Sequence, residues 1–266
     1  MSGRFGPPTV ALLTDFGSSD GYVGAMKGAM LAIEPRLRFI DVAHGIPRGD
    51  AAAAAWVLRQ SAPHFPTSCV QLAVVDPGVG SARRALAVQI AERFFVAPDN
   101  GLLTWVAEGA VSRCVELAGD FAPVGASPLF HGRDVFGPAA VHLATGGALG
   151  ELGRALDPAE LVRLPFAAAR TTGAVWSGTV VYVDHFGNLI TNLPLPVAPE
   201  DAVPLEGVVE ITGRNVPLRR TYADVATGEL VALRGSSGTL EVSVNGSSAA
   251  AALGISTGDV VTFRAY

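Results

Sequence analysis

One short stretch of the chain places an acid and two guanidinium groups around a glycine-rich turn. It runs over residues 74–84 and reads VVDPGVGSARR, with Asp76 directly after two β-branched residues and Arg83 seven positions further on. The β-branched pair is typical of a buried strand, and Pro77 and the glycines after it predict a tight loop that can pass close to a ligand. At the carboxyl end of a sheet strand, where α/β folds bind ligands, Asp76 and Arg83 would form the charged floor of a pocket. The alternative is a surface turn that Asp76 caps and whose arginines are solvated.

Four further loops concentrate polar side chains, and four of the five loops in all follow a predicted strand. The four are TDFG (14–17), FHGRD (130–134), DHFGN (184–188) and SSGTLE (236–241). Asp15 repeats the placement of Asp76, so carboxylates beside glycines recur at strand ends. A structural role stays open for each, because Asp15, Asp184 and Asn188 could equally cap turns.

The histidines and cysteines show no pattern of metal ligands. The histidines lack HxxxH or HxH spacing and the cysteines lack CxxC, so we predict no metal site. An isolated loop histidine is usually structural or solvated, and Arg133 could simply pair with Asp134. We expect that ordinary role for His131 less than for the other four histidines, His44, His64, His142 and His185. The chain has no GxSxG, GxGxxG or GxxxxGK[ST] motif, so serine-hydrolase, Rossmann dinucleotide and P-loop functions have no support.

Composition bounds the class of protein. The 266 residues are 49% hydrophobic and 16% charged, which is enough for a large core. A net charge of -5 without basic runs argues against a nucleic-acid partner. Cys69 and Cys114 neither define a disulfide framework nor exclude a single bridge. No segment approaches the about 18 apolar residues of a membrane span, and the N-terminus lacks a secretory core, so we expect a cytoplasmic protein without a membrane partner.

Strands and helices alternate over the first part of the chain and must position these loops. We expect strands at 9–13, 37–42, 69–75, 86–90, 94–97 and 112–116, and helices at 22–33, 50–60, 102–108 and 134–145. This alternation predicts an α/β domain with a largely parallel central sheet over residues 1–165. Short β-branched segments follow at 178–183, 208–211, 230–233, 240–244 and 260–264. Separated by Gly, Pro, Asn and Ser, they predict a small antiparallel barrel or sandwich over residues 173–266.

Six motifs, taken in order, resemble the S-adenosylmethionine hydrolase family, which is related to the fluorinase and chlorinase enzymes. They are LLTDFG (12–17), VVDPGVGSARR (74–84), APDNGLL (97–103), FHGRDVF (130–136), VDHFGNLITN (183–192) and SSGTLEVSVNGSSA (236–249). The resemblance implies an N-terminal α/β domain and a C-terminal antiparallel β-barrel. It further implies a homotrimer with each site between the N-terminal domain of one subunit and the C-terminal domain of its neighbour. No cofactor and no metal are expected.

The resemblance also implies a role for individual residues. The family's water-handling triad corresponds to Asp76, Arg83 and His131, and its ribose-binding carboxylate corresponds to Asp15. The other implied contacts lie in the second half of the chain: Asn188 on the adenine edge, Phe186 and Tyr222 on the adenine faces, the Val244 backbone near adenine, Asp184 on the methionine ammonium, and Ser236, Ser237 and Glu241 on the rest of the methionine end.

The halogenating relatives provide the sharpest alternative function. In these relatives, tyrosine replaces the triad carboxylate and threonine replaces the triad arginine, whereas this chain has Asp76 and Arg83. A fixed anion at Asp76 would repel a halide by about 4 kcal/mol, for unit charges about 4 Å apart at an effective dielectric of about 20. Water is therefore the expected nucleophile, and its attack at ribose C5′ would release adenosine and L-methionine. A protein that binds S-adenosylmethionine or adenosine without turnover is the remaining alternative.

Overall fold

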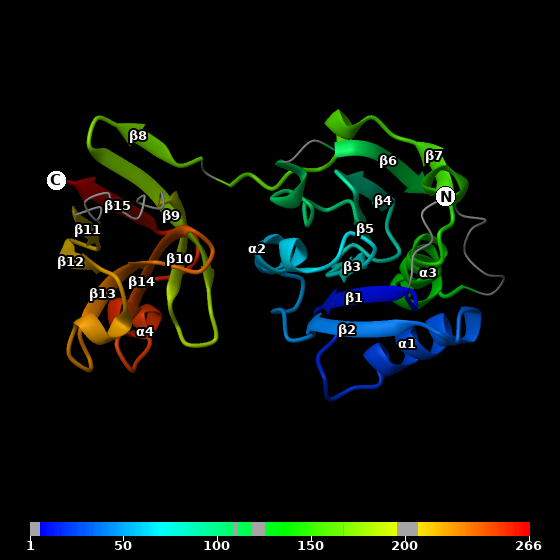
Figure 1. The fold of residues 1–266 in the computed structure, drawn as a ribbon, viewed down its shortest axis with the longest axis horizontal. Coiled ribbons are helices and arrows are strands. Elements are labelled where there is room, and N and C mark those ends of the chain that lie inside the picture. Colours follow the sequence, from blue (N-terminus) through cyan, green and yellow to red (C-terminus); the bar gives the residue numbers. More distant parts are fainter. Residues whose placement is uncertain (1–5, 109–110, 119–125, 167, 196–206) are drawn as a thin grey trace. The chain divides into compact units, whose positions relative to one another are not determined.

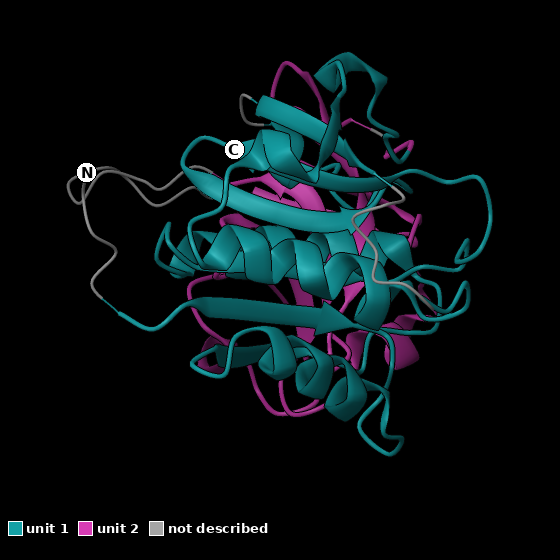
Figure 2. Cartoon of the chain, turned by 90° about the vertical axis from the view of Figure 1, so that its right-hand side faces the viewer, with its two compact units in different colours: residues 1–164 teal, residues 165–266 magenta. Residues whose placement is uncertain are grey.

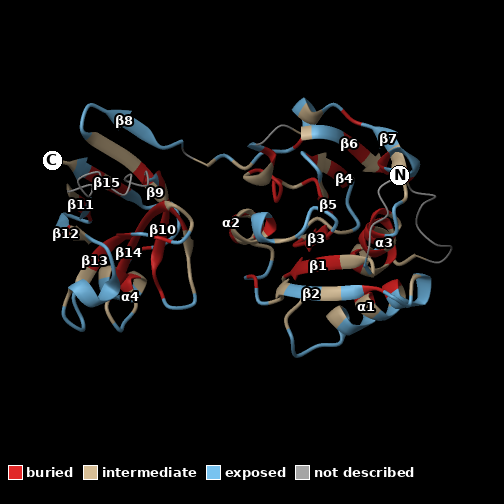
Figure 3. Ribbon diagram, in the orientation of Figure 1, coloured by how far each residue is buried: buried red, intermediate tan, exposed pale blue. Residues whose placement is uncertain are grey.

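The chain, in a computed structural model, folds into two compact units, Met1–Leu164 and Pro165–Tyr266 (Figures 1 and 2). The structure describes residues 6–108, 111–118, 126–166, 168–195 and 207–266. Among these residues, no helix is long and apolar enough to cross a membrane. Each unit has its own hydrophobic core, and Figure 3 shows buried residues gathered on β1, β3 and α3 of the first unit and on β10 and β14 of the second.

The described part of the first unit is built on a seven-stranded sheet in the order β2-β1-β3-β5-β4-β6-β7. The strands are β1 (Thr9–Thr14), β2 (Arg38–Ala43), β3 (Val70–Val74), β4 (Ala85–Ile90), β5 (Arg93–Pro98), β6 (Val111–Leu117) and β7 (Gly153–Ala155). The neighbours β2, β1, β3 and β5 run parallel, which confirms the predicted parallel core. The remaining pairs, β5 with β4, β4 with β6 and β6 with β7, are antiparallel. The first of them is a hairpin whose turn at 91–92 leaves no room for a crossover helix.

Three α-helices of the described chain accompany this sheet: α1 (Tyr22–Ile33), α2 (Ala51–Ser61) and α3 (Gly137–Ala144). The α1 and α3 helices contribute Met26, Met30 and Ala140 to one core cluster with the sheet. Short helical turns are η1 (Ala62–His64), η2 (Val106–Glu108), η4 (Gly132–Phe136), η5 (Leu149–Leu152) and η6 (Pro158–Glu160). The helix predicted at 102–108 is therefore wrong except for one 3₁₀ turn. The first residues of the helix predicted over 134–145 belong to a π-helical turn, η4, and the α-helix α3 follows it.

The second unit is a barrel that seven strands close. Its described strands are β9 (Val175–Val183), β10 (Leu189–Pro194), β11 (Gly207–Ile211), β12 (Arg214–Arg219), β13 (Leu230–Arg234), β14 (Thr239–Val244) and β15 (Val260–Ala265), with β8 (Arg170–Thr172) paired outside on β9. Pairing of β9 with β10 closes the ring. The predicted barrel is confirmed, with one parallel pair, β12 and β13, among antiparallel neighbours.

That parallel pair arises because β12 and β13 are joined by a crossing segment, which contains the 3₁₀ turn η7 (Tyr222–Asp224), instead of a hairpin. Sequence analysis missed β10 and β12 as strands, since each contains a proline and polar residues that are typical of loops. A short helix, α4 (Ala249–Leu253), completes the unit.

Both cysteines are buried free thiols. Burial raises the pKa of Cys69 and of Cys114 to about 11, so neither thiol is activated as a nucleophile.

Candidate active site

Asp76, Arg83 and His131 lie in direct contact at the carboxyl edge of the parallel strands. The Arg83 Nε donates to the two carboxylate oxygens of Asp76 at 2.9 and 3.0 Å, and its Nη2 contacts Oδ2 as well. The same Nη2 lies 2.7 Å from Nδ1 of His131. The Asp76 and Arg83 side chains are only 5% and 10% exposed. Arg83 therefore joins a buried acid and a half-buried imidazole into one cluster.

The loop that carries Asp76 is held by one local and one long-range hydrogen bond. The Val79 amide donates to the Asp76 carbonyl at 3.2 Å, which closes the turn after the proline. From the end of β5, Asn100 Nδ2 donates to the Val75 carbonyl at 2.8 Å. These contacts fix the backbone on each side of the Asp76 carboxylate, so the acid is held in place before any ligand arrives.

Phe136 lies against both Arg83 and His131, a role that sequence analysis missed. The Arg83 Cζ is 5.0 Å from the centre of the Phe136 ring, and the His131 ring centre is 6.5 Å from it. Phe136 is fully buried and ends the π-helical turn that follows His131. Such turns are frequent at functional sites, but their extra residue leaves no signal in the hydrophobic pattern, which predicts only a helix over residues 134–145.

The contact with Arg83 decides the protonation of His131. A guanidinium has only donors, so Nδ1 of His131 must accept, and the ring proton of the neutral imidazole then resides on Nε2. Burial, followed by the positive charge of Arg83, lowers the pKa of His131 below its ordinary value of 6.5, against the opposing charges of Asp76 and Asp134. The imidazole is therefore a neutral group that presents an N–H donor through Nε2.

Asp15 leaves the neighbouring strand at the same edge of the sheet. The register pairs Thr14 of β1 with Val74 of β3, so the loops of Asp15 and Asp76 start side by side. Oδ2 of Asp15 accepts a hydrogen bond of 2.8 Å from the Gly49 amide. Gly49 has φ +72, and a Cβ there would lie 3.4 Å from the Pro77 side chain. A glycine thus links the Asp15 loop to the Asp76 loop at close range.

Arg133 and Asp134 pair with each other. Their side chains form an ion pair of 2.6 Å, and the Arg133 guanidinium lies 4.9 Å from the Phe130 ring. Asp134 Oδ2 also accepts from the Ser127 amide at 2.7 Å. These contacts match the alternative in which Arg133 simply pairs with Asp134.

In the second unit, the carboxylate of Asp184 organises its own turn. Oδ1 accepts from the amides of Phe186 and Asn188 at 2.9 Å each, and Oδ2 accepts from Asn188 Nδ2 at 2.9 Å. The turn orients the amide group of Asn188, which is a buried residue, and leaves Phe186 73% exposed. These contacts match the turn-capping alternative for Asp184, and its contact with a methionine ammonium stays a prediction.

Tyr222 and Glu241 meet a short distance along the same barrel. The Tyr222 hydroxyl donates to Glu241 Oε1 at 2.5 Å, and the Ser243 hydroxyl donates to the same oxygen at 2.9 Å. Burial, then the hydrogen bond to Glu241, raises the pKa of Tyr222 above its ordinary value. Glu241 is thus a buried carboxylate held by two hydroxyls, and the Tyr222 ring remains 44% exposed.

The other predicted residues of the second unit are placed less tightly. The Ser237 hydroxyl lies 2.8 Å from that of Thr239, whereas Ser236 is exposed and its role stays a prediction. Val244 is buried in β14, and its carbonyl accepts from the Ser247 amide at 3.2 Å. Each unit therefore carries one group of predicted residues, four in the first and eight in the second.

The described residues were compared with the donor sets that bind metal ions in proteins. No group of three or more His, Cys, Asp and Glu side chains among them is arranged to hold a metal ion.

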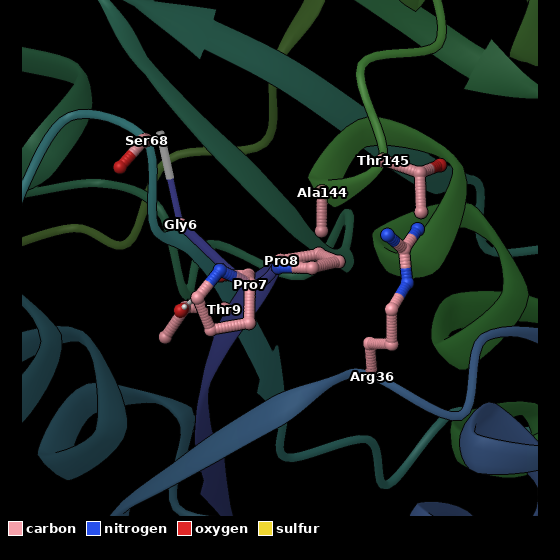
Figure 4. A pocket seen from close by; sticks show the side chains of 8 residues that line it. All are labelled: Gly6, Pro7, Pro8, Thr9, Arg36, Ser68, Ala144 and Thr145. Carbon is pink, nitrogen blue, oxygen red and sulfur yellow. Dashed lines mark hydrogen bonds between the residues drawn. The ribbon is translucent and has the colours of Figure 1, made fainter. Parts of the chain in front are cut away.

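A separate hollow of about 250 Å³ lies at the amino end of β1, at the opposite edge of the sheet from the triad (Figure 4). Its lining contains none of the predicted site residues: Gly6, Pro7, Pro8, Thr9, Arg36, Ser68, Ala144 and Thr145.

An α/β sheet with a charged triad at its carboxyl edge, followed by a closed barrel, defines a two-domain protein. Comparison identifies the class: the SAM hydroxide adenosyltransferase N-terminal domain matches residues 10–153, and the C-terminal domain of the same family matches residues 178–262. The chain belongs to this family.

Individual relatives extend the comparison over nearly the whole chain. An (R)-S-adenosyl-L-methionine hydrolase of Salinispora tropica is 41% identical over 95% of this chain and 96% of its own. A fluorinase of Actinoplanes sp. is 29% identical over 97% of each chain. The crystal structure of an uncharacterized conserved protein from Thermotoga maritima superposes with a TM-score of 0.86 at 32% identity, over 96% of this chain and 99% of that one.

Proposed function

We propose that this protein hydrolyses S-adenosylmethionine. Water attacks C5′ of the ribose, the bond from C5′ to sulfur breaks, and adenosine and L-methionine leave. The observation that carries the proposal is the hydrogen-bonded cluster of Asp76, Arg83 and His131 at the edge where α/β sheets bind ligands. The name of the Salinispora tropica relative supports the same reaction and favours the R configuration at sulfur.

The chemistry places its demand on the nucleophile. A neutral thioether leaves, so no general acid is needed. Full transfer of a proton from water to an ordinary carboxylate spans about 12 pKa units, or about 16 kcal/mol, and transfer to an ordinary imidazole costs about 12 kcal/mol. A free hydroxide made by either base is therefore disfavoured, and the proton leaves late, as the carbon–oxygen bond forms.

The hydrogen bonds favour different roles for the acid and the imidazole. Nδ1 of His131 is occupied by Arg83 and Nε2 bears the proton, so the imidazole orients water as a donor. Asp76 is then the proton acceptor through Oδ1, which accepts one bond from Arg83 and keeps a second lone pair, whereas Oδ2 accepts from both Nε and Nη2. Arg83 holds both groups in one geometry through its planar fork.

The substrate contacts follow the family resemblance. Asp15 would bind the ribose hydroxyls, Asn188 the adenine edge, and the exposed rings of Phe186 and Tyr222 the adenine faces. The same resemblance implies a homotrimer, and we propose that neighbouring subunits supply the two groups of contacts to each site. The proposal includes no metal, and the two free thiols suit a reducing cytoplasm.

A halogenase is the second candidate, and the fluorinase relative is the observation that favours it. The buried carboxylate of Asp76 weighs against it, since an anion at that position repels an incoming halide. A non-catalytic binding protein would need no such cluster.

One experiment separates these functions. The protein is incubated with each sulfonium epimer of S-adenosylmethionine in water labelled with oxygen-18, with or without EDTA and with or without chloride and fluoride. We expect adenosine that carries the label at its 5′ oxygen, unlabelled methionine, preference for the R epimer and no effect of EDTA. Asp76→Asn, prepared identically, should lose product formation and so controls for contaminating enzymes.

The other results would each overturn a stated part. A 5′-halogenated nucleoside would assign a halogenase, and binding without any product from either epimer would assign a binding protein. Loss of activity in EDTA, restored by a divalent ion, would reject the metal-free mechanism.

A further inference from the structure

A chain of four polar side chains lies beside Asp15 and outside the triad. Lys27 Nζ donates to Asp41 Oδ2 at 2.7 Å, and Asp41 Oδ1 lies 2.9 Å from Nε2 of His44. Nδ1 of His44 in turn lies 2.8 Å from the Thr14 hydroxyl. Thr14 is completely buried and directly precedes Asp15. The chain thus runs from a half-buried lysine on α1 to the last residue of β1.

The bond directions in this chain follow from charge. Burial raises the pKa of Asp41, but its hydrogen bonds with Lys27 and His44 outweigh that effect and lower the pKa overall. An ionised Asp41 can only accept, so Nε2 of His44 donates to it. The Thr14 hydroxyl then donates to Nδ1 of a neutral ring, or accepts from a charged one. The contact between Thr14 and His44 survives in both states.

The same residues join the two loops that contact Asp15. Besides its side-chain contact with Thr14, His44 accepts a hydrogen bond of 2.8 Å at its carbonyl from the Gly17 amide. Five residues later, the Gly49 amide donates to the Asp15 carboxylate at 2.8 Å. The loop over residues 44–49 is therefore anchored at one end by His44, and its other end sets the orientation of the acid.

An acid, an imidazole and a hydroxyl in series also occur in nucleophilic enzymes, but that role does not fit here. Thr14 has no exposed surface, and its hydroxyl oxygen also accepts a hydrogen bond of 3.3 Å from the Phe16 amide. A substrate atom has no route to a hydroxyl buried under its own loop. The arrangement acts on the backbone around it.

We infer that His44 is a positioning residue, which locks the 44–49 loop to the end of β1 through Thr14 and Asp41 and so aims the Asp15 carboxylate at the ribose. The inference rests on the ribose-binding role of Asp15 in the proposed function. It assigns to His44 an effect that depends on the ribose hydroxyls and not on the adenine or the methionine. His44, which the sequence suggested to be structural or solvated, would then determine selectivity for the sugar.

The test measures binding of adenosine and of 2′,3′-dideoxyadenosine to the full-length protein by calorimetry. The ratio of the two dissociation constants reports the contact between Asp15 and the hydroxyls. His44→Gln and the isosteric Thr14→Val break the chain, Thr14→Ser keeps the hydroxyl, and Asp41→Asn weakens the exposed end without altering the core. His142→Gln is the matched control, since His142, like His44, has a carboxylate near its Nε2 (Glu151, at 3.1 Å) but lies on α3.

We expect His44→Gln and Thr14→Val to lose about 2- to 10-fold of the preference for adenosine, the range of one intramolecular hydrogen bond. Dideoxyadenosine should bind all variants alike, and Thr14→Ser and His142→Gln should keep the wild-type ratio. Equal ratios in wild type and His44→Gln, with adenosine preferred in both, would overturn the positioning role alone. No preference in the wild-type protein would overturn the role of Asp15, and the inference with it. If Thr14→Val does not fold, the ratio for His44→Gln decides, and Asp41→Asn should change the ratio in the same direction as His44→Gln.

Discussion

At the scale of single residues, Arg83 makes three side chains into one unit. Its guanidinium binds the Asp76 carboxylate through two nitrogens and reaches His131 with one of them, while its face lies on Phe136. A lysine has one donor centre and no planar face, so it could not make these contacts together. The geometry of the triad therefore depends on the shape of the arginine as well as on its charge.

The protonation of His131 gives a prediction in pH. Its pKa lies below the ordinary 6.5, so activity should be constant above about pH 6.5 and fall in acid with a midpoint under that value. Protonation would remove the Nδ1 lone pair that accepts from Arg83. His131 also affects stability. Between its lower pKa in the folded protein and its ordinary pKa in the unfolded chain, the unfolded chain binds more protons. The free energy of unfolding therefore decreases as the pH falls from the unfolded-state pKa towards the folded-state pKa.

The measurements are kcat/KM and the urea midpoint as functions of pH. His131→Asn is the matched variant, because the Asn side-chain oxygen can still accept from Arg83 but does not titrate. Its urea midpoint should decline less than that of the wild type on acidification. An acid limb centred above pH 6.5 would contradict a neutral, arginine-bound imidazole.

At the scale of elements, the site is set by how strands end. Parallel strands β1 and β3 bring Asp15 and Asp76 to one edge, and a π-helical turn then supplies His131 and Phe136 from the start of α3. In the barrel, the turn between β9 and β10 orients Asn188 in the same way. That turn is docked on α4, because the Ala250 amide donates to the Gly187 carbonyl at 3.0 Å.

Gly187 gives a prediction for this turn. It has φ +82, and a Cβ would lie 2.1 Å from the Ser248 hydroxyl that caps α4. Gly187→Ala should lower the free energy of unfolding by about 2–4 kcal/mol and weaken adenosine binding, because strain and collision both displace Asn188. Gly213→Ala is the control: it has φ +72 with open space around its Cβ, so it should show only the strain, about 1 kcal/mol. Urea unfolding and adenosine titration measure both effects, and equal losses in the two variants would reject the collision.

At the scale of the whole molecule, the predicted contacts divide into a group on the α/β unit and a group on the barrel. The proposed trimer makes each site from two subunits, and mixed assemblies can test this. Asp76→Asn inactivates the first group, and Asn188→Ala impairs the second. If the two variants are unfolded and reassembled together in equal amounts, about one site in four should combine two intact groups and recover activity.

The recovery is measured as product formed per protein, against each variant reassembled alone. Activity that stays at the level of the separate variants, in assemblies shown by mass to be mixed, would place both groups in one subunit. A monomer in solution by light scattering would reject the trimer directly.

The amino-acid sequence by itself determined the strands of the parallel core and the loops at their ends. Buried β-branched runs and glycine-rich turns are local signals, so the parallel core and the positions of Asp15 and Asp76 follow from neighbouring residues. The motif resemblance named Arg83 and His131 as partners. What the sequence left open were the choices between a capping and a binding role, as for Asp184 and Arg133, where local hydrogen bonds satisfy the side chain.

Only the tertiary structure decided which distant groups touch. Arg83 and His131 are 48 positions apart, and Thr14 and His44 are 30 apart, so no spacing rule predicts either contact. The parallel pairing of β12 with β13 likewise depends on how the barrel closes. Such contacts arise when burial of the apolar faces brings separate loops to one edge, and buried polar groups then need partners wherever the chain supplies them.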